Sequence, residues 1–179
     1  MFPAKPSKMT SLQQLWDDLS RVRSLRFIAR SGSATGWNGL GRGVVAVETH
    51  GDEVQTFAES GTWRTEAGRE LRFHNVYRWT RNQPTLRLEH LRFGVDHPVY
   101  LFDLAQTGDR EWRSVSPHAC GEDRYSAILL VGDVLALRWA VVGPTKQEVI
   151  EYEYFCDEVE PGVKPDGAAI QAGSVLEKK

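Results

Sequence analysis

A chain of 179 residues with 41% hydrophobic and 26% charged residues has the composition of one ordinary globular domain. Its net charge of -2 and its scattered basic residues argue against a nucleic-acid-binding surface. The longest apolar run, residues 127–131, is far too short to span a bilayer.

The ends of the chain differ from its middle. Residues 1–9 are predicted to form a flexible arm, without the apolar segment of a secretory signal. Residues 157–179 are rich in Glu, Pro, Gly, Ala and Lys, so we expect disorder or an extended wrap. A single domain is therefore expected over residues 10–156. Two cysteines, Cys120 and Cys156, make no disulfide framework, which favours a cytoplasmic protein with reduced thiols.

One helix is predicted ahead of the strands. Thr10 or Ser11 can cap it. Its apolar positions follow helical spacing, so that one face is buried. These positions are Leu12, Leu15, Trp16, Leu19 and Val22.

From Leu25 the apolar period changes to two, which is typical of strands. Strands are predicted over residues 25–29, 44–48, 54–64, 71–79, 86–93, 99–104, 111–115, 125–131, 134–142 and 148–156. The Gly-rich stretch 31–43 is expected to be a long loop or a bent strand. Between Leu88 and Leu91 the apolar side chains change face, which suggests a bulge.

Strands at nearly even spacing, joined by short turns, favour an antiparallel up-and-down β-barrel. Closure removes the exposed edges of an open sheet. We expect about eight to ten strands, enclosing either a packed interior or one small ligand. The helix should close or flank one end of this barrel.

Polar residues alternate with apolar ones in two predicted strands. Arg72, His74 and Arg78 share one face of the strand at 71–79, and Arg138 lies between Ala136 and Ala140. Pointing outward, these side chains would be ordinary solvated residues, which is the preferred interpretation. Pointing inward, they would form a polar floor for an anionic ligand. Tryptophans such as Trp79 and Trp139 would fill or line the barrel.

Three metal-competent side chains, His118, Cys120 and Asp123, fall within six positions. Their spacing matches no strong zinc pattern, so no metal is expected. A Cys-His nucleophile is disfavoured because no helix N-terminus is predicted to lower the thiol pKa. The glycines at 39–43 lack the context of a phosphate loop, and no cofactor is expected.

Several short motifs occur in order along the chain: LGRG at 40–43, ESGTW at 59–63, YRW at 77–79, HACGEDRY at 118–125 and WAVVGPTK at 139–146. Together they resemble the DUF6314 family, small proteins without an assigned activity. The resemblance spans about residues 12–155. It implies a calycin-like (lipocalin-like) barrel and implies no reaction.

The preferred function is non-enzymatic binding of a small apolar or amphipathic ligand, with an acidic group as an option. The candidate contacts are His118, Tyr125, Arg138, Lys146, Trp79 and Trp139. One alternative is an enzyme in the same cavity, with His118 as acid/base and Asp123 orienting it. A second alternative is a filled barrel that acts as an interaction module and pairs with itself as a homodimer. An open cavity would favour the first interpretation, and a filled barrel the last.

Overall fold

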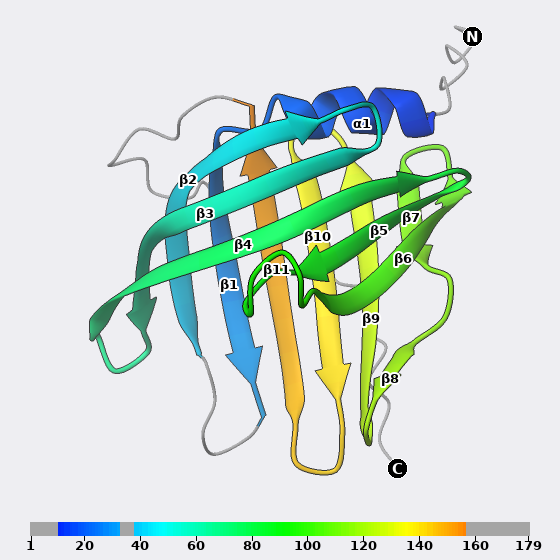
Figure 1. Cartoon of the computed structure of the whole chain (residues 1–179). Coiled ribbons are helices and arrows are strands. Elements are labelled where there is room, and N and C mark those ends of the chain that lie inside the picture. Colours follow the sequence, from blue (N-terminus) through cyan, green and yellow to red (C-terminus); the bar gives the residue numbers. More distant parts are fainter. Residues whose placement is uncertain (1–10, 33–37, 157–179) are drawn as a thin grey trace, which may run out of the picture.

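A computed structural model describes residues 11–32 and 38–156 (Figure 1). Both the predicted arm and the predicted tail lie outside these residues. The described elements are α1 (Leu12–Ser20), β1 (Ser24–Ser31), β2 (Gly39–His50), β3 (Val54–Thr65), β4 (Glu70–Asn82), β5 (Thr85–His90), β6 (Val99–Gly108), β7 (Glu111–Ser114), β8 (His118–Cys120), β9 (Asp123–Val131), β10 (Leu135–Val142) and β11 (Gln147–Phe155).

The strands form one closed antiparallel barrel. From β1 to β7 each strand pairs with its sequence neighbour. β9 follows β7 in the ring, and β10 and β11 come next. The ring closes where β11 pairs with β1, with Ser24 opposite Phe155. Ten of the described strands make the ring, and β8 pairs only with the start of β9. The predicted all-β barrel with an N-terminal helix is confirmed.

Helix α1 covers one end of the barrel, at the top of Figure 1. The N–H of Gln14 donates to Oγ of Ser11, which caps the helix as expected. The predicted apolar face is buried, with Leu15 and Leu19 fully so. On the barrel side, Nε2 of Gln55 in β3 donates to the backbone carbonyl of Trp16. The helix is therefore packed into the barrel end.

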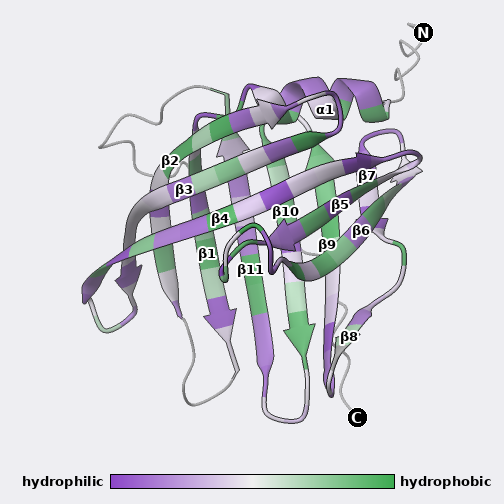
Figure 2. Ribbon diagram, in the orientation of Figure 1, coloured by the Kyte–Doolittle hydropathy of each residue, from purple (hydrophilic) through white to green (hydrophobic). Residues whose placement is uncertain are grey.

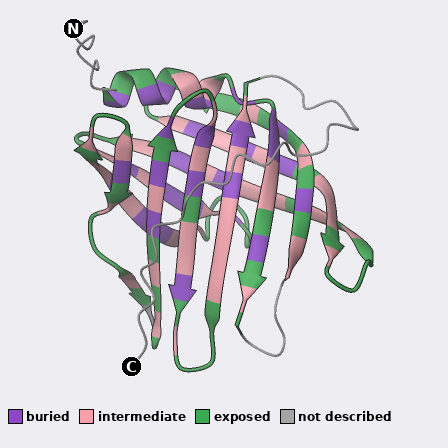
Figure 3. Ribbon diagram, turned by 180° about the vertical axis from the view of Figure 1, so that it is seen from behind, coloured by how far each residue is buried: buried purple, intermediate pink, exposed green. Residues whose placement is uncertain are grey.

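Hydropathy and burial alternate along many of the strands (Figures 2 and 3), as expected when successive side chains face the inside and the outside of the barrel. In β4, Tyr77 and Trp79 are buried, whereas Arg72 and His74 are exposed. In β10, Leu137 is buried and its neighbour Arg138 is exposed. The preferred interpretation, in which these polar faces point outward, is confirmed.

Most strand boundaries differ from the predictions by a few residues, and β8 was not predicted. β2 begins at Gly39, so the last part of the Gly-rich stretch 31–43, expected to be a long loop or a bent strand, is a strand paired with both β1 and β3. An irregularity does interrupt the β5–β6 pairing, because Leu88 pairs with Phe102 but Glu89 pairs with Tyr100. The extra residue is therefore Leu101, on β6, and β5 itself ends at His90.

The half of the barrel next to α1 is packed solid. Phe57 contacts both Trp79 and Tyr154 edge-on, with ring centroids 6.2 and 5.8 Å apart. All three side chains are buried and belong to the same apolar cluster as the helix residues. The half of the barrel away from the helix is therefore where an interior space remains. Within residues 11–32 and 38–156, no helix has both the length and the apolar character of a membrane span.

Candidate functional site

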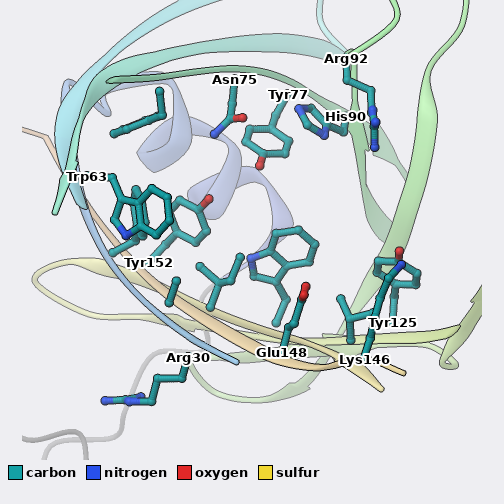
Figure 4. Close-up of a pocket in the computed structure, with 16 residues that line it drawn as sticks. Arg30, Trp63, Asn75, Tyr77, His90, Arg92, Tyr125, Lys146, Glu148 and Tyr152 are labelled. Carbon is teal, nitrogen blue, oxygen red and sulfur yellow. The ribbon is translucent and has the colours of Figure 1, made fainter. Parts of the chain in front are cut away.

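A cavity of about 470 Å³ occupies the barrel half away from the helix. Figure 4 looks into it, with α1 behind. Its apolar and aromatic lining consists of Phe27, Ala29, Trp63, Phe73, Tyr77, Trp139, Val141, Ile150 and Tyr152. Its polar lining consists of Arg30, Asn75, His90, Arg92, Tyr125, Lys146 and Glu148. This size and lining suit a small, mostly apolar molecule held by a few polar groups.

Phe27 anchors the aromatic wall. Its ring centroid lies 5.3 Å from those of both Phe73 on β4 and Tyr152 on β11. Gly41 on β2 makes this possible: a Cβ atom there would lie 2.1 Å from the Phe27 ring. Gly41 therefore leaves room for the Phe27 ring against the sheet.

A buried carboxyl group, that of Glu59 on β3, lies beside the inner end of the cavity. It is fully buried, and the hydroxyl of Tyr154 donates to its Oε1 atom at 2.8 Å. Asn75, its register partner on β4, lines the cavity. The Asn75 amide also favours the charged form, but Oε2 receives no hydrogen bond of good geometry from the described residues.

Burial raises the pKa of Glu59 to about 8, and the side chains of Tyr154 and Asn75 only partly oppose that rise. Burial also raises the pKa values of Tyr77, Tyr152 and Tyr154, and the nearby Glu59 adds to the rise. At neutral pH this cluster is therefore mostly uncharged, with a protonated Glu59. A carboxyl group with a strongly raised pKa beside a cavity is a typical mark of a functional site.

His90 lies at the edge of the same cluster. Its ring stacks on that of Tyr77 at 4.7 Å. Partial burial, followed by the nearby positive charge of Arg92, lowers the pKa of His90. The imidazole is therefore neutral around pH 7 and adds a neutral polar group to the cavity wall.

The mouth of the cavity carries opposite charges in near balance. Nζ of Lys146 lies 2.6 Å from Asp123. Arg30 points away from the cavity (Figure 4), and its Nη1 lies 2.6 Å from Glu151 on the outer surface. Arg92 lies over the ring of Phe93 at 4.6 Å. Of the two cations whose side chains remain at the mouth, Lys146 thus already has a carboxylate partner.

The comparisons with known proteins concern the barrel alone. A model described as a family of unknown function (DUF6314) matches residues 25–155, well over half of the chain. The chain belongs to the DUF6314 family. No curated protein and no solved structure matches it.

Three of the predicted contacts of this DUF6314 barrel line its cavity: Tyr125, Trp139 and Lys146. Trp79 points inward but is buried in the packed half, against Phe57. Arg138 points to the outside, where it is 46% exposed and lies 3.5 Å from Glu151. Arg138 cannot reach the cavity, because the barrel wall separates them.

His118 and Asp123, expected in the enzyme alternative to act together, have other partners in the structure. The His118 ring contacts the rings of Tyr100 and Tyr125, with centroids 4.6 and 6.1 Å apart. Asp123, expected to orient this histidine, instead binds Lys146 and packs against Gly143. No group of three or more possible metal ligands is found among the described residues.

Three polar residues of this site were not selected from the sequence: Glu59, His90 and Asn75. One signal was present: Gln55, Phe57 and Glu59 alternate on one face of their strand, and Phe57 is a typical core residue. Once Phe57 is placed inside, the alternation places Glu59 inside the barrel too. A charged residue on a core face is unusual enough to indicate a function.

Proposed function

We propose that the protein binds a small apolar or amphipathic molecule in the barrel cavity. The supporting observation is the aromatic cavity of about 470 Å³ in a barrel whose other half is packed. Transfer of an apolar ligand from water to such walls is favourable by about 25 cal/mol per Å² of buried apolar surface. In the alternative of an interaction module with a filled barrel, this interior space would be occupied by side chains.

The mouth supports an amphipathic ligand. Arg92 is exposed and has no carboxylate within ion-pair distance among the described residues, so an acidic group could bind there. A hydrophobic acid would then place its apolar body between Trp63 and Trp139. The expected cytoplasmic location and a homodimer remain predictions; light scattering after size exclusion tests the second.

The test uses an anilinonaphthalene sulfonate, whose emission rises in apolar sites. We expect it to bind the native protein and to quench tryptophan emission. Ala29→Phe should abolish binding because Ala29 lines the cavity and the added ring would occupy it. Ala46→Phe is the matched control, since Ala46 is exposed on the outside of β2.

Equal binding by both variants would contradict the proposal, as would the absence of binding to the folded wild type. Native mass spectrometry of freshly purified protein provides an independent check. It should reveal a small molecule that co-purifies with the wild type and is lost in Ala29→Phe.

A further inference from the structure

A buried carboxyl group with an incomplete set of hydrogen bonds, that of Glu59, lies at the inner end of the cavity. Glu59 is fully buried, and among the described residues it has no Lys or Arg within ion-pair distance. Tyr154 satisfies Oε1, while Oε2 accepts no well-formed hydrogen bond from them. A buried carboxyl group left partly unsatisfied is costly, so such groups usually have a partner.

The cavity provides access for such a partner. Asn75 interacts with Glu59 and also lines the cavity, as do Tyr77 and Tyr152 (Figure 4). The two tyrosines also interact with each other through their hydroxyls. The carboxyl group is thus one side chain away from a bound molecule.

The aromatic rings near this end favour one ligand chemistry. Tyr77 and Tyr152 line the cavity together with Asn75 and present π-systems, which attract organic cations. The mouth opposes a cation little, because Lys146 is paired with Asp123, Arg30 points away from the cavity, and Glu148 lines the mouth as well.

We propose that the inner end of the cavity binds the protonated amine of an aromatic or alicyclic ligand, with Glu59 as its counter-charge. This inference rests on the proposed small-molecule binding and names the ligand class. The ammonium group donates to Oδ1 of Asn75 and to a tyrosine oxygen. The amide N–H of Asn75 then donates to the Glu59 carboxylate.

The proton balance of this step is defined. Before binding at neutral pH, Glu59 carries a proton because burial raises its pKa to about 8. On binding, Glu59 loses that proton to solvent and the ammonium charge compensates the new carboxylate. The other titratable groups packed against Glu59 are Tyr77 on β4 and Tyr152 and Tyr154 on β11. All have raised pKa values and stay protonated.

The experiment compares three probes that share one ring system: naphthylethylamine, naphthaleneethanol and naphthylacetate. Isothermal titration calorimetry at pH 7 should find the amine about tenfold or more tighter than the alcohol, as a charge-assisted contact predicts. Repeating the titration in buffers of different ionisation enthalpy should show release of about one proton per amine bound. The alcohol should release none.

Glu59→Gln should remove the preference for the amine and the proton release, while the alcohol still binds. Glu148→Gln, which changes a carboxylate at the cavity mouth, is the matched control and should keep both. If Glu59→Gln does not fold, the wild-type titrations still test the proposal, because release of a proton with the amine and not with the alcohol is the expected result.

Two results would overturn the amine site while leaving the binding cavity intact. One is tightest binding of naphthylacetate, which would place the polar group at Arg92. The other is an amine preference without proton release. If no probe binds and Ala29→Phe changes nothing, the proposed function itself fails.

Discussion

The hydroxyl of Tyr154 donates a 2.8 Å hydrogen bond to Oε1 of Glu59 across the barrel, although 95 positions separate the two residues. β11 carries the tyrosine and β3 carries the carboxyl group. The two strands are not neighbours in the sheet, so the contact spans the interior. It links the packed half of the barrel to the inner end of the cavity.

Glu59 should make stability fall as pH rises. Burial raises its pKa from the ordinary value of 4.5, which applies to the unfolded chain, to about 8 in the folded protein, so between these values the folded state holds the proton more tightly. The free energy of unfolding should therefore decrease from pH 4.5 to 8, by at most about 1.4 kcal/mol per pH unit from this group. Urea unfolding of Glu59→Gln over this range should give a flatter profile. Parallel profiles for variant and wild type would contradict the buried, protonated state.

Trp16 should be essential to the closed end. It is 5% exposed and belongs to the main apolar cluster. Trp16→Ala should lower the free energy of unfolding by roughly 3–5 kcal/mol. Gln14→Ala, on the exposed face of the same helix, is the control and should change the urea midpoint little. An unchanged midpoint for Trp16→Ala would mean that the helix is peripheral.

Gly61 should not tolerate a side chain. A Cβ atom there would lie 2.1 Å from the backbone oxygen of Arg42 on the paired strand. Backbone cannot move aside cheaply, so Gly61→Ala should cost about 1–3 kcal/mol or more. Gly108→Ala is the comparison, since its nearest neighbour would be an ordinary 3.5 Å away. Thermal unfolding of the two variants measures the difference, and equal midpoints would refute the close approach of β2 and β3.

Arg138 should be neutral for ligand binding. It lies on the outer surface, and its exposed ion pair with Glu151 is worth at most about 1 kcal/mol. Arg138→Leu should therefore leave the affinity for an anilinonaphthalene sulfonate unchanged in fluorescence titration. Arg92→Leu, at the cavity mouth, should weaken it. The reverse pattern would mean that the probe binds outside the barrel.

The sequence predicts much of the barrel because local alternation determines which residues share a face. In β4, residues 71–79 alternate cleanly, and the predicted face carrying Tyr77 and Trp79 is the inner one. The Gly-rich start of β2 could not be predicted in the same way. Glycine carries no hydropathy signal, and what makes residues 39–43 a strand is pairing with β1 and β3.

The site was harder to predict because it depends on long-range contacts. Trp139 was selected as a tryptophan within a predicted strand, and it lines the cavity together with the predicted contacts Tyr125 and Lys146. Arg138 was selected for its small neighbours, but these neighbours share its outer face. The buried state of Glu59 depends on Tyr154 from the far end of the chain, which no local pattern reveals.

The pairing of Ser24 with Phe155 brings the first and last strands of the ring together at the end that α1 covers. The backbone N–H of Arg23 also donates to the carbonyl of Phe155. A tether attached just after Cys156 would therefore leave the barrel beside the helix, remote from the cavity mouth. Immobilisation through that point should orient the mouth toward solution, which makes the protein well suited to surface-based screening of small molecules.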